Sequence, residues 1–190
     1  MQAAAPYAMS QFGPGQTLVF APLPKRPLAP HELRIRVLAC GVCRTDLHVV
    51  DGELPHTVYP VIPGHEVVGR VDQLGSAIVD YAIGQRVGVS WLAETCGSCA
   101  YCRAQRENLC DSAKFTGYTR PGGFASHISM DSRFVIPLKA DGDDAAAGPL
   151  LYAGLIEWRS LERFSDARRV ILYGLGAAAH IALQLLRHYV

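Results

Sequence analysis

Polar and apolar side chains alternate most clearly over residues 32–39, where Leu33, Ile35 and Val37 fall on one face. This period of two is typical of a strand with one buried face. Shorter apolar runs with Gly and Pro between them suggest further strands at 17–20, 67–71, 85–91, 122–129 and 133–137. Many short strands without a long helix predict an antiparallel, barrel-like β domain over roughly the first 140 residues.

The pattern changes after residue 139. Asp143 or Asp144 could cap a helix containing the alanines at 145–147, and Pro149 should interrupt or restart it. Apolar residues at three- and four-residue spacing predict a helix over 150–164. We therefore place a domain boundary between residues 148 and 149.

Residues 149–190 are interpreted as a connecting helix and the first unit of a truncated α/β domain. The apolar stretch 170–173 predicts a buried strand, and a helix should follow over 177–189. One strand and one helix cannot complete a parallel sheet. We expect residues 170–173 and one face of the last helix to expose apolar surface, which association of copies into a homo-oligomer could cover.

Composition narrows the class of protein. Of 190 residues, 49% are hydrophobic and 18% charged, as in a globular domain with a sizeable core. The net charge of +1 gives no basic footprint for nucleic acid, and no apolar run is long enough to span a bilayer. The N-terminus lacks the features of a signal peptide. We expect a cytoplasmic protein without nucleic-acid or membrane partners.

A cluster of cysteines carries the strongest chemical signal: Cys96, Cys99, Cys102 and Cys110. Two-residue gaps let neighbouring thiolates converge on one ion, and four thiolates close a tetrahedral shell around Zn²⁺ without an open position. The spacing therefore predicts a structural zinc site. A disulfide cluster and an iron–sulfur site are the weaker alternatives.

Gly174, Gly176 and Ala179 follow the apolar stretch in a G-x-G-x-x-A pattern. In dinucleotide-binding units the first position makes a tight turn, the second lets the backbone approach the pyrophosphate, and the third packs the helix on the strand. The alternative is a tight turn without a ligand. The acidic residue that reads the ribose would fall beyond Val190, so NAD and NADP both remain open.

Cys43 and His65 form a second metal candidate. A catalytic zinc needs about three protein ligands and one open position. These residues can supply two ligands, and Glu66 could be another ligand or lie behind one. A buried cysteine and a turn histidine without metal are the alternative, and spacing alone does not separate the two.

Taken in order, C-R-T-D-L-H at 43–48, G-H-E-x-x-G-x₅-G from residue 64, the four cysteines and the Gly174 turn resemble the zinc-dependent medium-chain alcohol dehydrogenases. The resemblance covers essentially the whole chain. It implies a GroES-like antiparallel β-barrel domain followed by the start of a Rossmann domain. It also implies hydride transfer between an alcohol and NAD(P)⁺. The competing hypothesis is a non-catalytic, zinc-stabilised GroES-like module.

The resemblance also implies roles for single residues. Cys43 and His65 would be ligands of a catalytic zinc, with Glu66 beside it. The other matching positions would serve cofactor, substrate or ligands: Arg44 at the pyrophosphate, Thr45 on the alcohol oxygen, Asp46 behind the ligands, His48 in a proton relay and Trp91 in the substrate pocket. The plain alternatives are helix capping for Thr45 and Asp46, a surface position for His48 and core packing for Trp91.

The sequence departs from the family pattern after Pro149. The third zinc ligand of the family is a cysteine in a segment like P-L-L-C-A-G, and this chain has Tyr152 there. A free phenol has a pKa of about 10 and is a poor ligand at neutral pH. Glu157 stands where a small residue usually lies near the nicotinamide. We therefore expect a firm structural zinc, a weakened or absent catalytic zinc, and NAD or NADP as cofactor.

Overall fold

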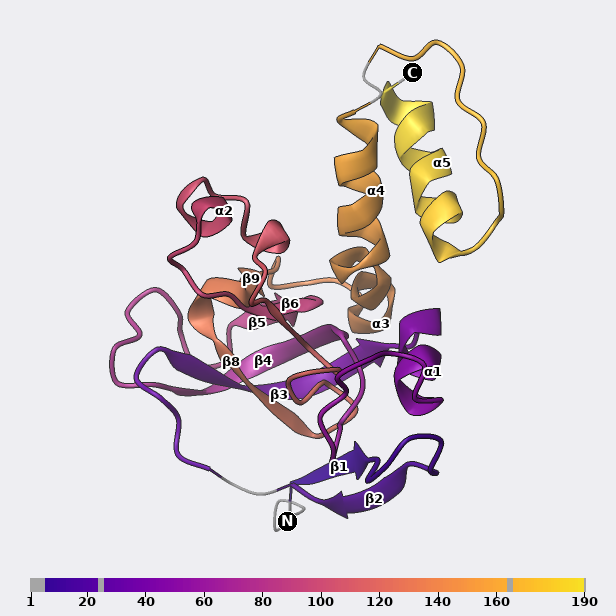
Figure 1. Ribbon diagram of the computed structural model, residues 1–190. Helices are drawn as coiled ribbons and strands as arrows, with labels where there is room; N and C mark the ends of the chain where they lie inside the picture. Colours follow the sequence, from indigo (N-terminus) through magenta and orange to yellow (C-terminus); the bar gives the residue numbers. More distant parts are fainter. Residues whose placement is uncertain (1–5, 24–25, 164–165, 190) are drawn as a thin grey trace.

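The centre of the molecule is a curled antiparallel sheet (Figure 1). The computed structural model describes residues 6–23, 26–163 and 166–189. Five strands pair in the order β8-β3-β4-β5-β9: β8 (His127–Asp131), β3 (Glu32–Gly41), β4 (Glu66–Leu74), β5 (Arg86–Val89) and β9 (Val135–Pro137). Two short hairpin-like pairs flank it, β1 (Tyr7–Ser10) with β2 (Val19–Pro22) and β6 (Leu92–Glu94) with β7 (Lys114–Phe115). The predicted antiparallel β domain is confirmed.

The core lies on one face of this sheet. Leu33 and Ile35 of β3 are fully buried, as their alternation predicts. Valines from the neighbouring strands pack against them: Val67, Val71, Val87 and Val89. Irregular register between β3 and β4 near Val37 lets the last residues of β3 pair with the start of β4. Such bulges increase strand twist and redirect the chain, which brings the end of β3 toward the candidate site.

Short helices connect the strands and cover their edges. They are α1 (Arg44–Val50), α2 (Ala100–Arg103), η1 (Glu107–Leu109), η2 (Ser132–Phe134), α3 (Asp144–Ala147), η3 (Gly148–Leu151), α4 (Ala153–Leu161) and α5 (Ala177–Tyr189). Asp143, not Asp144, caps α3, because its carboxylate accepts hydrogen bonds from the amides of Ala145 and Ala146. Asp144 instead pairs with buried Arg86 at 2.7 Å, which anchors α3 to the sheet.

The helix expected over 150–164 starts later than predicted. Residues Gly148–Leu151 form the 3₁₀ turn η3, with Pro149 in its first turn, and α4 begins at Ala153. Proline has no amide hydrogen and disfavours a continuous α-helix through this point. Phe164, at the predicted end, lies outside the described residues.

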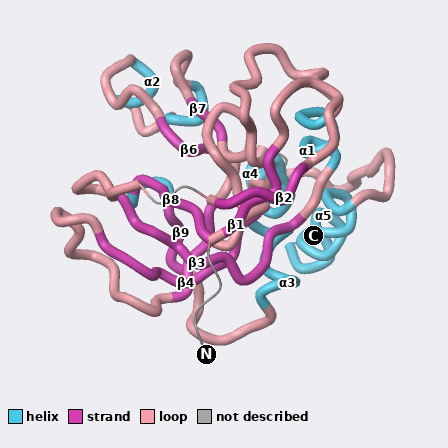
Figure 2. Tube along the Cα trace, turned by 90° about the horizontal axis from the view of Figure 1, so that it is seen from below, coloured by secondary structure: helices cyan, strands magenta, loops and turns pink. Residues whose placement is uncertain are grey.

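The strand predicted at 170–173 is wrong. The segment is extended but unpaired, and Ile171 and Tyr173 are almost fully exposed. A parallel strand needs hydrogen-bonded neighbours, and none of the described residues pairs with this segment. The predicted helix over 177–189 is confirmed as α5, which packs on α4 in a hairpin beside the sheet (Figures 1 and 2). The expected apolar exposure at 170–173 is confirmed.

No helix within the described ranges has the length and apolar character needed to cross a membrane.

Candidate metal centres

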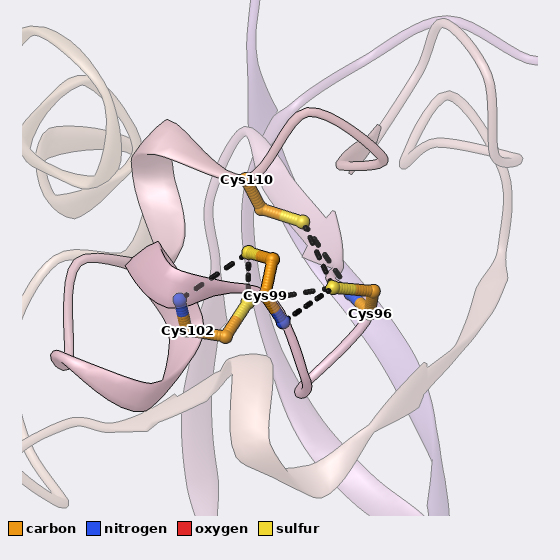
Figure 3. Close-up of side chains that lie close together, drawn as sticks. All are labelled: Cys96, Cys99, Cys102 and Cys110. Carbon is orange, nitrogen blue, oxygen red and sulfur yellow. Dashed lines mark hydrogen bonds between the residues drawn. The ribbon is translucent and has the colours of Figure 1, made fainter.

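Four sulfur atoms converge in the segment between β6 and β7, which we call the cysteine lobe (residues 96–110; Figure 3). The Sγ–Sγ separations are 3.5 Å for Cys99–Cys102, 3.6 Å for Cys96–Cys110 and 3.9 Å for Cys96–Cys102. A tetrahedral ion with metal–sulfur bonds of about 2.3 Å requires sulfur separations of about 3.8 Å. All four cysteines are free thiols. The lobe therefore fits a four-thiolate zinc and contains no disulfide.

Backbone amides donate hydrogen bonds to sulfur atoms of the cysteine lobe. Cys99 is the N-cap of α2, and its Sγ accepts a hydrogen bond from the Cys102 amide. Cys96 Sγ accepts one from the Cys99 amide at 3.3 Å. Amide donors from Ser98 and Cys99 lower the pKa of Cys96 to about 6. A thiolate is the form that binds metal, so this position is preset for coordination.

Cys43 and His65 meet at a second centre, although they are far apart in sequence. Cys43 is the N-cap of α1, and His65 lies directly before β4. Cys43 Sγ is 3.2 Å from His65 Nε2. His65 is 1% exposed. The folded chain therefore places two zinc-ligand types side by side in a buried position.

Asp46 holds both segments of this centre. Its carboxylate accepts hydrogen bonds from the backbone amides of Cys43 and Gly64, each at 2.9 Å. Its Oδ1 also lies 3.2 Å from His65 Nδ1. A carboxylate on one ring nitrogen orients the other toward a metal. Asp46 therefore aims His65 Nε2 at Cys43 Sγ.

The charges of this centre are coupled. Burial opposes a charged His65, but hydrogen bonds to Asp46 and Cys43 outweigh it and raise the pKa of His65 to about 9. Burial also opposes the Cys43 thiolate, and hydrogen bonds from His65 and the Thr45 amide nevertheless lower its pKa. Without metal the pair favours imidazolium beside thiolate. A metal ion must displace the His65 proton, as metal binding at such ligands generally does.

The ligand atoms of Cys43, Asp46 and His65 lie within 4.8 Å of one another, and Glu66 is outside this group. Glu66 is 3% exposed, and burial raises the pKa of its carboxyl. Its side chain lies against Gly41, where a Cβ would collide with Oε2. The structure thus does not bring Glu66 in as a direct ligand beside the other three.

Aromatic rings surround His65. Tyr152, the residue before α4, meets the His65 ring edge-to-face with centroids 4.6 Å apart, and Trp91 does so at 5.1 Å. Trp91 in turn stacks on Phe115 and Tyr118, at 5.0 and 6.0 Å. Sequence reasoning missed Phe115 and Tyr118, for which the i, i+3 aromatic spacing was the available signal. These rings form an apolar wall beside the centre.

The other residues predicted for the site lie outside the group formed by Cys43, Asp46 and His65. Arg44 and Thr45 open α1, with Arg44 exposed, and His48 follows one turn later. His48 Nδ1 is hydrogen-bonded to Glu53 at the surface. Gly174 and Gly176 precede α5 in open space, Gly174 with φ of +97°, and Ala179 lies in its first turn. Their predicted cofactor roles stay predictions.

The turn that carries His65 is unusually crowded. Gly64 has φ of +97°, and a Cβ there would lie 2.6 Å from Phe124 Cδ1 and 2.8 Å from Cys40 Sγ. The backbones of Gly117 and Gly122 also approach it, since a Cβ on either would collide with Gly64 main-chain atoms. Side chains at these positions would push the three loop segments apart. The close approach fixes where His65 enters the site.

A family model described as "Alcohol dehydrogenase GroES-like domain" matches residues 29–140. The chain belongs to the medium-chain alcohol dehydrogenase family. It is 46% identical over 164 residues to a probable alcohol dehydrogenase, AdhA, of Mycobacterium tuberculosis, covering 83% of this chain and 47% of that protein. The chain spans about half the length of the curated relatives it matches.

Solved structures of alcohol dehydrogenases share the fold. A cinnamyl alcohol dehydrogenase of Sorghum bicolor is 28% identical with a TM-score of 0.86, covering 97% of this chain and 56% of that one. The structure of CAD from Helicobacter pylori complexed with NADP(H) has a TM-score of 0.87 at 24% identity, covering 97% of this chain and 56% of that one. The GroES-like fold of this family member is thereby confirmed.

Proposed function

We propose that this chain forms the catalytic domain of a zinc-dependent alcohol dehydrogenase, which transfers hydride between an alcohol and NAD(P)⁺. One observation carries the proposal most directly. Cys43 and His65 lie 3.2 Å apart, and Asp46 orients the histidine from its far side. That is the ligand arrangement of a metal centre, in a chain that belongs to the medium-chain alcohol dehydrogenase family.

The chain's own residues divide the work. Cys43 and His65 would hold the catalytic ion, and Asp46 fixes the tautomer of His65. Trp91 excludes water from one side of the centre with its aromatic stack. Thr45 and His48 lie three residues apart on α1, and side chains at this spacing share a face. We assign them the removal of the alcohol proton, with His48 passing it to Glu53 at the surface.

Bound zinc supplies the Lewis acidity that lowers the pKa of an alcohol. The nicotinamide cofactor supplies the hydride acceptor. We assign Arg44 and the Gly174–Gly176–Ala179 turn to its pyrophosphate, with residues 1–148 as the GroES-like domain and 149–190 as the start of the cofactor domain. NAD and NADP remain the two candidates for this cofactor.

The substrate class in this proposal is a small alcohol, with the aldehyde or ketone as product. We also propose a cytoplasmic location, supported by free cysteines throughout the chain, because disulfides are rare in reducing compartments. Exposed apolar side chains on the α4–α5 hairpin, such as Leu155 and Ile171, support self-association into a homo-oligomer. Light scattering of the purified chain would test that point.

The activity is tested by following nicotinamide reduction with a panel of primary and secondary alcohols. We expect His65→Ala to abolish turnover, because it removes a metal ligand. His31→Ala, at an exposed histidine, serves as the matched control. Equal rates of alcohol oxidation in His65→Ala and His31→Ala would contradict the metal-dependent mechanism.

A second candidate is a non-catalytic, zinc-stabilised GroES-like module. Tyr152 at the third ligand position favours it, because this chain lacks the family's cysteine there. A folded, zinc-loaded protein without alcohol-dependent turnover on any substrate would support this candidate over the enzyme.

A further inference from the structure

The two metal centres of this chain offer very different sets of donors. The cysteine lobe presents four sulfur atoms within 4.8 Å of one another. The second centre presents one sulfur and one ring nitrogen that face each other, Cys43 Sγ and His65 Nε2. Zinc in proteins is held by at least three thiolate, imidazole or carboxylate ligands. The second centre therefore needs another donor from nearby.

Asp46 cannot serve as that donor without dismantling the centre. Its oxygens already accept hydrogen bonds from the Cys43 and Gly64 amides. It also faces Nδ1 of His65, the nitrogen on the opposite side of the ring from Cys43. Moving the carboxylate to the ion would leave two amides without acceptors and the histidine without its orienting partner, and buried polar groups without partners are destabilising.

Glu66 is also an unsuitable donor. Its carboxyl is packed against Gly41, and it is not in the group with Cys43 and His65. A shift toward the ion would require its side chain to leave this buried site.

Tyr152 places an aromatic ring against His65. The ring lies edge-to-face against His65, with centroids 4.6 Å apart, and 6.1 Å from the Trp91 ring. Its position is fixed by the turn η3, whose last residue Leu151 is buried beneath Gly88 of β5. A neutral phenol is not among the ligands that zinc sites in proteins ordinarily use.

We propose that Tyr152 makes the Cys43–His65 centre an exchangeable metal site, which releases zinc under conditions in which the cysteine lobe retains it. This rests on the proposed function only in taking Cys43 and His65 as ligands. The chain then carries one permanent ion that supports its structure. A second ion enters and leaves, so that any chemistry at this centre depends on the metal supplied from solution.

Elemental analysis after gel filtration with a competing chelator tests the proposal. We expect one zinc per chain in the wild-type protein and in Tyr152→Phe. We expect two in Tyr152→Cys, because a third thiolate or imidazole is the usual requirement of a closed protein site. Tyr152→His supplies an imidazole instead and provides a second test if the cysteine variant does not fold. The zinc in the lobe and the far-UV circular dichroism report folding in every variant.

A titration with Co²⁺ measures the second site directly. Absorption from cobalt–thiolate charge transfer should show weak, reversible binding to the wild type. Tyr152→Cys should bind Co²⁺ at least about tenfold more tightly than the wild type. Loss of a residue that only orients a ligand already weakens metal binding by about tenfold or more, and this variant gains a ligand. Cys43→Ser should lose this signal and keep the ion in the lobe, which assigns the weak site.

Three results would overturn the proposal. If the wild type retains two zincs, the Cys43–His65 centre binds zinc tightly. If Tyr152→Phe then loses one of them, the phenol of Tyr152 is a ligand. One zinc in both the cysteine and histidine variants would show that Tyr152 is not what weakens the site. No zinc in the wild type would remove the contrast between the centres. Zinc retention does not require turnover, so an inactive Tyr152→Cys with two zincs would support this proposal and count against the dehydrogenase.

Discussion

Asp46 is the residue on which the electrostatics of the candidate active site depend. In the metal-free protein we expect a pKa of about 9 for His65, because the Asp46 carboxylate and the Cys43 sulfur stabilise its imidazolium. Asp46→Asn removes the negative charge and should lower this pKa toward the value of about 6.5 for a free imidazole. Asp51→Asn, an exposed acid at the end of the same helix, is the matched control.

NMR titration of the His65 ring resonances measures both variants. If Asp51→Asn lowers the pKa of His65 as much as Asp46→Asn does, the pKa is set by long-range electrostatics and not by the hydrogen bond to Asp46. A pKa near 6.5 in the wild type would contradict the coupling altogether.

Gly64 allows a second test at the scale of one residue. Gly64 and Gly84 both have positive φ, +97° and +82°, but a Cβ on Gly64 would strike Phe124 and Cys40, while Gly84 faces open space. Gly84→Ala should cost about 1–2 kcal/mol for the left-handed backbone alone. Gly64→Ala should cost about 1–3 kcal/mol more, because the packed surroundings must also move.

Chemical denaturation of the two glycine variants gives this difference directly. Equal losses in the two would mean that the surroundings of Gly64 yield freely, contrary to the packing described.

The sequence predicted the pair Cys43 and His65 through its resemblance to a family, not through spacing. Twenty or so residues separate such ligands, and only the pairing of β3 with β4 and the turn into α1 brings them together. The resemblance also placed Asp46 behind the ligands, but its hydrogen bond to the Gly64 amide had no signal in the sequence, since it depends on where the fold puts that amide. Spacing was sufficient for the cysteine lobe, because its ligands are local.

Among the elements, the cysteine lobe should depend most on its metal. It joins the sheet through the short pair β6–β7, and few apolar side chains within it are buried. Cys99→Ser removes one of four thiolate ligands and leaves a hydroxyl that can still cap α2, so the variant tests the metal alone, and metal-coupled folding should fail there. We expect loss of the lobe's zinc and a melting temperature lower by several degrees.

Ala100→Ser is the matched control for this variant, since it adds a hydroxyl at the next, exposed position and leaves every thiolate in place. Zinc content and a thermal melt are measured on both. Unchanged zinc content together with an unchanged melting temperature in Cys99→Ser would count against Cys99 as a ligand.

Prediction of the elements succeeded where the apolar pattern was long or strongly periodic. The strand at 32–39 was found because its alternation extends over several repeats, and the helix at 177–189 because it follows the glycine turn. The strands β1, β6 and β7 were missed, since two to four residues carry no readable period. The apolar stretch 170–173 was taken for a strand because hydrophobicity reports a tendency to be buried, while strand structure requires a partner.

At the scale of the whole molecule, apolar side chains are distributed unevenly between sheet and C-terminal segment. Ile35 in the core is fully buried, whereas Ile171 is 93% exposed. The same substitution should therefore be tolerated at Ile171 and strongly destabilising at Ile35. Ile171→Glu should leave the melting temperature unchanged and lower the binding of a hydrophobic dye. Ile35→Glu should unfold the domain, because it buries an unpaired charge.

Circular dichroism and dye fluorescence on both isoleucine variants check this. A large fall in the melting temperature of Ile171→Glu would show that residues 170–173 are packed in solution, in contrast to the exposed arrangement described.

The close approach of three glycine backbones behind the turn at Gly64 also limits how this domain can vary. Gly64, Gly117 and Gly122 have no side chains. A larger residue at one of them therefore cannot be accommodated by a smaller residue at another. In ordinary protein cores, pairs of compensating substitutions allow the sequence to change. Such pairs are not available at these three positions. In a library selected for folded protein, we expect all three to remain glycine while Gly84 accepts replacements, so that this crossing changes more slowly than the apolar core around it.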